Sequence, residues 1–301
     1  MGRAVFTGRV SVGGQHLGKI DPLVLAQSRT TISLLVLVPI LLFRRSSALH
    51  VRGSHLLQFF LLGVVGLAAS NYFYYLAIDR TSVATAIVLQ YVAPVWVLFY
   101  MVARGLQRPT IQRILAVVLA VIGCGFAVGE IAAQRSFPWL GLSGVRFNTI
   151  GVVAAELAAL SFAFYNVYAQ HLLRTYERWT VLAYALFGAA AFWIVLNPPW
   201  KIAAHHYSPG QWAFMGVFSM TSMLIPFSFY FTGLQHLDPT RAIVTSCLEP
   251  VWAILLTAIL LGELVSPIQV LGMLIVLSAT VLIQRPDQSH REPTIAVEPI
   301  E

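Results

Sequence analysis

The chain has 301 residues, of which 58% are hydrophobic and only 10% are charged, and its formal net charge is +7. A soluble domain carries about 25% charged residues, and a soluble chain this apolar would expose hydrophobic patches too large for a stable monomer. The composition therefore argues against a soluble protein and predicts a lipid bilayer as the surroundings of the chain.

The same sequence argues against several other classes. No cluster of Lys and Arg with interleaved aromatic residues lies outside the apolar segments, so nucleic acid is not an expected partner. Cys124 and Cys247 fall inside apolar segments without metal-ligand spacing, so we expect no metal site and no disulfide framework. The patterns GxSxG, HExxH and GxxxxGK[ST] do not occur. We therefore expect neither an enzyme nor a bound cofactor, and no direct use of ATP.

In chain order, the sequence begins with a polar segment at 1–20, which includes Arg3, Arg9 and Lys19. This segment is too polar to span a bilayer and lacks the continuous apolar region of a signal peptide. Nine apolar spans follow, at 22–43, 55–78, 82–103, 112–130, 147–170, 180–197, 210–234, 240–261 and 267–284. A polar tail at 285–301 ends the chain and is expected to be disordered.

The basic residues predict the orientation, because loops rich in Lys and Arg stay in the cytoplasm. Loops on one side hold Arg44, Arg45, Arg52, Arg104, Arg108, Arg113, Arg174, Arg178, Arg241, Arg285 and Arg291. Loops on the other side hold only Arg80, Arg135, Arg146 and Lys201. We therefore expect a multi-pass protein of the cell (inner) membrane with a cytoplasmic C-terminus.

One motif occurs twice in the chain. AIVLQYVAPVW at 86–96 and AIVTSCLEPVW at 242–252 share six of eleven positions at an offset of 242 − 86 = 156 residues. The first copy enters the bilayer from the outside and the second from the inside, so the two repeats are inverted. Inverted repeats place a substrate site near the middle of the bilayer. The predicted fold class is an all-α integral membrane protein with nine to ten transmembrane helices in two inverted repeats.

The segments NYFYYLAIDRTSVATAIVLQYVAPVWV at 71–97 and GLQHLDPTRAIVTSCLEPVWAILLTAILLGELVSPIQVLGMLIVL at 233–277 resemble the two halves of an EamA-type carrier of the drug/metabolite transporter superfamily. The LEPVW…LGE pattern at 248–263 is their most specific part. The resemblance implies a 5+5 plan of helices with both termini in the cytoplasm. It also implies transport of a small metabolite, amino acid or drug across the inner membrane, often outward.

The two predicted repeats differ in length. The second repeat, 147–284, supplies five helices, whereas the first, 21–130, supplies four clear ones, and an external linker at 131–146 joins them. The first helix of the 5+5 plan would fall on 1–20. A truncated or frame-shifted start and a true nine-helix variant both explain this pattern. Without that helix one wall of the cavity is missing, so the alternative function is a degenerate, non-transporting membrane protein or subunit, and a homodimer stays open.

Glu249 is the leading candidate for function, because an ionisable side chain within hydrocarbon is costly and usually faces the interior of a bundle. At about 100° per residue, Arg241, Thr245, Glu249 and Trp252 fall within about an 80° sector of one helix. This sector predicts a stripe that faces a cavity, and the alternative is a residue that only fixes packing. Glu249→Gln is expected to weaken transport or to change its pH dependence.

Glu156 is the second candidate, with Asn166 on its side of the helix, and a packing role is again the alternative. Arg29 is expected to snorkel toward the outer surface rather than to bind an anion. Prolines in the repeated motif predict kinks at the middle of the bilayer. The candidate substrate-binding residues are Asn71, Tyr75, Trp96, Glu156, Asn166, Thr245, Glu249 and Trp252, and the candidate hinges are Pro94 and Pro250. The predicted function is a secondary transporter, acting as an exporter by alternating access.

Overall fold

The structure is a computed structural model that describes residues 20–45, 49–81, 83–133, 148–262 and 264–285. Within these ranges, nine helical segments are long and apolar enough to cross a membrane. They coincide with the nine spans expected from the sequence to within a few residues, so that prediction is confirmed. The predicted segment 1–20 lies outside the described residues except for Ile20, as does the tail 285–301 except for Arg285.

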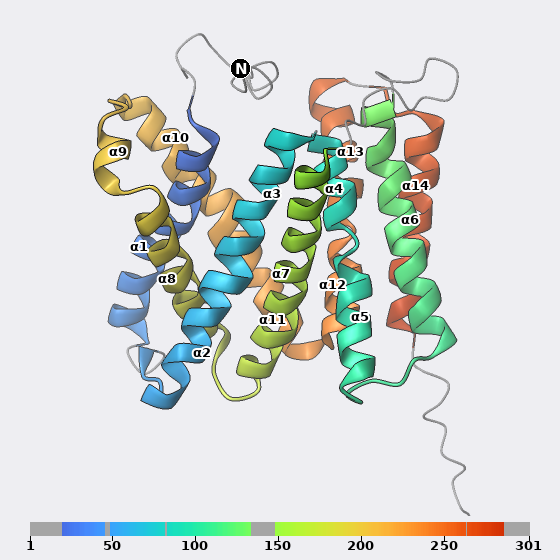
Figure 1. Cartoon of the computed structure of the whole chain (residues 1–301), viewed down its shortest axis with the longest axis horizontal. Coiled ribbons are helices and arrows are strands. Elements are labelled where there is room, and N and C mark those ends of the chain that lie inside the picture. The colour runs from blue at the N-terminus through green and yellow to red at the C-terminus, as the bar shows by residue number, and fades with distance from the viewer. Residues whose placement is uncertain (1–19, 46–48, 82, 134–147, 263, 286–301) are drawn as a thin grey trace, which may run out of the picture.

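Figure 1 shows the spans running roughly parallel and antiparallel to one another, with α10, α11, α12, α13 and α14 behind the helices nearest the viewer. The first repeat contains α1 (Pro22–Arg44), η2 (Gly53–His55), α2 (Leu56–Leu61), η3 (Leu62–Ala68), α3 (Ala69–Arg80), α4 (Val83–Gln90), α5 (Ala93–Ala103) and α6 (Ile111–Ala133). The second contains α7 (Thr149–Leu173), α8 (Arg178–Leu196), α9 (Pro199–Ala203), α10 (Pro209–Ser219), η4 (Met220–Leu224), α11 (Ile225–His236), α12 (Pro239–Ser246), α13 (Glu249–Leu261) and α14 (Pro267–Gln284).

The irregularities of the helices repeat at the same offset as the sequence motif. The break between α4 and α5 falls at 91–92, and the break between α12 and α13 falls at 247–248, which is 156 residues later. The π-helical turns η3 and η4 also correspond, because 62–68 shifted by 156 becomes 218–224. The duplication predicted from the sequence therefore extends to the fine structure of the helices.

The helices begin where short polar side chains can satisfy their free N–H groups. Asp21 Oδ1 accepts a hydrogen bond from the Leu23 amide at 2.8 Å at the start of α1. Ser208 and Ser266 each form a capping box with a glutamine three residues later. A proline follows each of these three caps directly, where its missing N–H does no harm. These local signals fix the boundaries of the spans.

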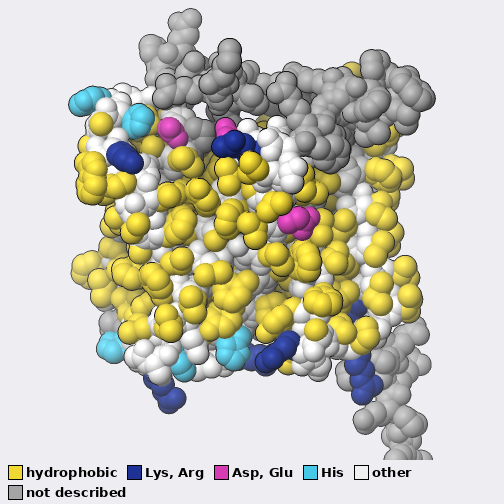
Figure 2. Space-filling model, in the orientation of Figure 1, with side chains coloured by type: hydrophobic (Ala, Val, Ile, Leu, Met, Phe, Trp, Pro, Cys, Tyr) yellow, Lys and Arg dark blue, Asp and Glu magenta, His cyan; other side chains and the backbone are white. Residues whose placement is uncertain are grey.

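Side chains are sorted by depth in the way that a bilayer requires. Hydrophobic side chains cover the middle of the face shown in Figure 2, while Lys, Arg and His side chains gather at its upper and lower edges. We call the lower end in Figure 1, which holds Arg44, Arg104, Arg113, Arg241 and Arg285, the basic end.

Two helix contacts depend on glycine because the backbones approach too closely for a Cβ atom. A Cβ at Gly63 of η3 would lie 2.5 Å from the Ala185 carbonyl oxygen of α8. A Cβ at Gly123 of α6 would lie 2.7 Å from Val276 Cγ2 and 2.9 Å from Val276 N of α14. Close approach of this kind is how helices associate in lipid, where van der Waals packing replaces the hydrophobic effect.

We expect Gly123→Ala to destabilise the protein by about 1–3 kcal/mol, the usual range for overpacking a tight contact. The added methyl group would meet backbone atoms of α14 that cannot move independently. Gly125→Ala is the matched control, because it lies on the same helix and its Cβ would meet nothing within 4 Å. Thermal unfolding followed by size-exclusion chromatography of the detergent-solubilised variants measures the difference, and equal stability of the two would contradict the prediction.

The structure corrects one prediction about local structure. Helix α6 continues to Ala133 and residues 134–147 lie outside the described residues, so the external linker 131–146 stays a prediction. The repeated motif was expected to kink two continuous helices, but each helix stops and restarts. Pro94 and Pro250 occupy the first turn of the restarted helices α5 and α13, where proline is tolerated.

Candidate functional site

The two helix breaks lie near the middle of their spans and leave backbone groups outside regular helical bonding. At the first break, the Val92 amide bonds to the Leu89 carbonyl at 3.1 Å, and at the second the Leu248 amide bonds to the Thr245 carbonyl at 3.1 Å. Irregular backbone at this depth is tolerated where protein or a cavity surrounds it. Discontinuous helices of this kind form the substrate sites of many transporters with inverted repeats.

Glu249 is the first residue of α13 and lies directly after the second break. Its side chain is exposed although it lies near the middle of the span Pro239–Leu260. It interacts electrostatically with Arg29 of α1, Tyr74 of α3 and Tyr91 of the first break. These partners come from three other segments of the bundle. We call Arg29, Tyr74, Tyr91 and Glu249 the central cluster.

Arg29 does not snorkel, so the prediction for this residue is wrong. Its Nη2 donates a hydrogen bond to the Ser222 carbonyl oxygen of η4 at 2.9 Å, and its guanidinium lies 5.7 Å from the ring centroid of Phe218. Its Nε is buried and has no hydrogen-bond partner among the described residues. The irregular π turn η4 presents the carbonyl, and this anchor holds Arg29 inside the bundle, where it adds a positive charge opposite Glu249.

Glu156 and Trp96 meet across the two repeats. Trp96 Nε1 of α5 donates a hydrogen bond to Glu156 Oε2 of α7 at 3.3 Å, and both side chains are half-buried. Trp252, which is the repeat equivalent of Trp96, is 62% exposed, and its indole forms no hydrogen bond with the described residues.

Asn166 and Asn71 already have their hydrogen-bonding groups engaged within the protein. Asn166 is fully buried, donates to the Phe162 carbonyl at 2.7 Å and accepts a hydrogen bond from the Tyr230 hydroxyl of α11. Asn71 donates to the Leu67 carbonyl of its own helix at 2.7 Å. Tyr75 is half-buried and its ring lies 5.7 Å from that of Tyr74. The hydrogen bonds of Asn71 and Asn166 hold both side chains against their own helices, whereas Tyr75 adjoins the central cluster through its interaction with Tyr74.

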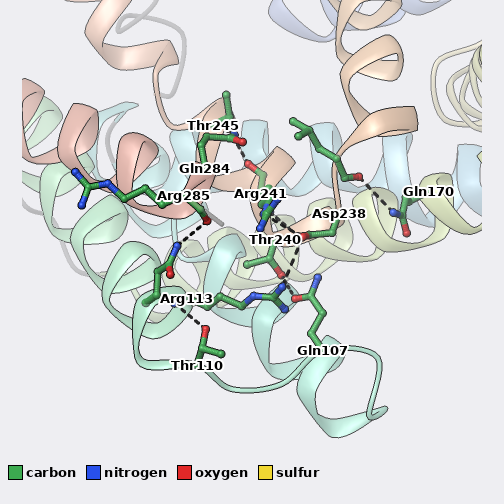
Figure 3. A network of polar contacts seen from close by, with 12 residues as sticks. Gln107, Thr110, Arg113, Gln170, Asp238, Thr240, Arg241, Thr245, Gln284 and Arg285 are labelled. Carbon is green, nitrogen blue, oxygen red and sulfur yellow. Dashed lines mark hydrogen bonds and ion pairs between the residues drawn. The ribbon is translucent and has the colours of Figure 1, made fainter. Parts of the chain in front are cut away.

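The stripe predicted for 241–252 is divided by the helix break. Thr245 Oγ1 donates to the Arg241 carbonyl at 2.7 Å and accepts a hydrogen bond from Gln284 Nε2 at 2.9 Å, so it belongs to a polar network at the basic end (Figure 3). Arg241 belongs to the same network. Only Glu249 joins the central cluster. The prediction assumed one continuous helix, and the break at 247–248 changes the direction of the residues that follow it.

Tyr74 and Tyr91 are members of the cluster that sequence reasoning missed. Tyr91 occupies the first break, and its repeat equivalent is Cys247 (91 + 156 = 247), which occupies the second. The signal that could have identified Tyr91 is its position three residues before Pro94 in the duplicated motif. Tyr74 carried no such signal, because aromatic residues are common in every span.

A bundle of membrane-spanning helices with two corresponding broken helices and a polar cluster between them is characteristic of a membrane transporter. The chain belongs to the EamA-like transporter family, whose model matches residues 1–129 and 149–285. The family resemblance drawn from the repeated motif and the all-α membrane fold are thereby confirmed.

Curated relatives agree with this assignment, and a solved structure shares the fold. An uncharacterized inner membrane transporter, YicL, of Salmonella typhimurium is 24% identical over 230 residues, which is 75% of this chain and 72% of the relative. An uncharacterized transporter of Archaeoglobus fulgidus is 26% identical over 227 residues, covering 74% of this chain and 76% of the relative. A crystal structure covers 89% of each chain with a TM-score of 0.71 at 19% identity, which shows the shared fold.

Proposed function

We propose that this membrane transporter moves a small metabolite, amino acid or drug outward across the inner membrane by alternating access, with its basic end and C-terminus in the cytoplasm. The observation that carries the proposal is the central cluster, which joins both repeats. Arg29, Tyr74 and Tyr91 come from the first repeat and Glu249 from the second. A solute bound there would contact both halves, so rocking of one half against the other would change its access.

The polarity of the cluster limits the solutes it can bind. It offers one guanidinium, one carboxyl group and two phenol rings, each from a different span with a mean hydropathy between 1.6 and 1.9. A solute with both polar and flat apolar parts satisfies these groups, because phenol rings bind flat or cationic surfaces and the charged groups bind polar ones. Glu156, hydrogen-bonded to Trp96, is the second acidic group available for recognition or ion coupling.

Solute flux in proteoliposomes tests the proposal. The purified chain is reconstituted and loaded in turn with amino acids and with cationic drugs, and efflux is compared with empty liposomes. Efflux of at least one solute, saturable and reduced by an excess of the same solute, supports a transporter that works alone. Absence of flux for every solute, with the protein inserted and folded, supports the alternative of a non-transporting membrane protein or subunit. A homodimer stays a prediction, which the mass of the detergent-solubilised protein tests.

A further inference from the structure

The basic end carries a polar network that joins the two repeats (Figure 3). Its centre is Asp238, which lies between α11 and α12 in the second repeat. Asp238 Oδ2 lies 3.3 Å from Arg241 Nε and 3.9 Å from Arg113 Nη2, and Arg113 belongs to α6 of the first repeat. Thr240 Oγ1 donates a 2.7 Å hydrogen bond to Gln107 Oε1 in the α5–α6 connection. We call these five residues the basic-end network.

The charged side chains of the network are partly buried, so water screens their ion pairs less than it screens pairs at the surface. The side chains of Arg113, Asp238 and Arg241 are 14%, 26% and 27% exposed. By contrast, the ion pair between Arg45 and Glu177 at the same end is 58% and 61% exposed. Ion pairs in full contact with water contribute little, because solvent screens them, whereas half-buried pairs are screened less.

The network lies beside the basic-end termini of α5 and α12, because Gln107 follows α5 and Asp238 caps α12. The half-helices α5 and α12 lead from this end to the two breaks. They pack on each other through Val97 and Met101 of α5 and Ile243 of α12, all of them buried. Opening a passage between α5 and α12 therefore requires Val97 to part from Ile243. It also requires the α5–α6 connection to move away from Asp238 and Thr240.

The repeat positions that correspond to Asp238, Arg241 and Arg113 carry no charge. The repeat equivalents of Asp238 and Arg241 are Ser82 and Thr85 at the offset of 156 residues. The equivalent of Arg113, after the one-residue insertion that follows the motif, is Val270. Two inverted repeats with identical sequences would close both ends alike, so a charged contact whose repeat-equivalent positions are uncharged favours one of the two states.

We infer that the basic-end network is a gate that holds the basic end closed, and that Asp238 is its central positioning residue. The gate goes beyond the proposed transport activity, because it specifies which contacts must break between the two states. In the described conformation the gate is shut, and its ion pairs stabilise this state relative to the one that opens toward the basic end.

Cysteine accessibility tests the gate without any solute. Val97→Cys is introduced into a background with Cys124→Ser and Cys247→Ser, and its reaction rate with a membrane-impermeant maleimide is measured in nanodiscs. Asp238→Asn is then added; asparagine preserves the cap of α12 and removes only the charge. We expect the reaction rate of Val97→Cys to rise by about fivefold, the factor that corresponds to loss of a half-buried ion pair from one state.

Glu177→Gln is the matched control, because it breaks an ion pair at the same end but outside the network. Thr240→Val is a second gate variant that keeps every charge and removes the hydrogen bond to Gln107. Faster labelling in both gate variants, with no change in Glu177→Gln, is the expected result. Equal labelling in Asp238→Asn, Glu177→Gln and the parent would overturn the gate, whatever the flux assay shows. Flux absent with faster labelling would instead refute the transport proposal and leave the gate intact.

Discussion

Replacing Glu249 by glutamine is expected to reduce solute efflux by about tenfold or more without reducing the amount of folded protein in the membrane. The carboxyl group lies at the start of α13, among Arg29, Tyr74 and Tyr91, and it forms no hydrogen bond with the described residues. It is therefore available to a solute. A hydrogen bond to a charged group contributes about 1.5–3 kcal/mol, which corresponds to a factor of roughly 10 to 100 in binding.

The matched control is Glu177→Gln, which removes a carboxyl group that is 61% exposed at the basic end. Efflux is measured in proteoliposomes over a range of solute concentrations, so that weaker binding and slower turnover can be separated. Unchanged efflux in Glu249→Gln at every solute concentration would exclude this residue from the site. An equal loss in Glu177→Gln would indicate a general effect of the lost charge and not a role at the centre of the bundle.

The duplicated motif made the centre of the fold predictable, because aligning its two copies shows which positions of the two repeats correspond. Pro94 and Pro250 mark both helix breaks at one offset, and Glu249 directly precedes the second proline. The positions of the nine spans followed from hydropathy alone, since their lengths are set by the thickness of the bilayer. The sequence could not indicate that the helices stop and restart rather than bend, because proline is compatible with either structure.

The partners of individual side chains were much less predictable. Arg29 was expected at the outer surface because it lies near the end of its span, but its hydrogen bond to the Ser222 carbonyl in η4 holds it inside. The residues around Arg29 do not indicate that its hydrogen-bond partner lies in a π turn about 190 residues later in the chain. Trp96 and Trp252 occupy the same position of the duplicated motif, but Trp96 bonds to Glu156 of α7 whereas Trp252 is 62% exposed. Such pairings depend on the register between helices, which periodicity along one helix does not determine.

Arg29→Gln is expected to reduce efflux by about tenfold or more, and Arg29→Lys by a smaller factor. Glutamine removes the charge that faces Glu249, whereas lysine keeps the charge but not the planar group that reaches both the Ser222 carbonyl and the Phe218 ring. Efflux of both variants is measured at matched protein amounts. If Arg29→Lys reduced efflux as much as Arg29→Gln does, the contacts of the planar guanidinium and not its charge would be the essential feature.

The double variant Arg29→Gln/Glu249→Gln tests whether the two charges act together. Residues that act as a pair have non-additive effects, because removing either one already disables the other. We therefore expect the double variant to transport about as much as the weaker single variant, and not to show the product of the two losses. If the double variant instead reduced efflux by the product of the two single-variant factors, Arg29 and Glu249 would contribute separately. The carboxyl group would then bind solute without help from the guanidinium, and the role of Arg29 would be to hold α1 against η4.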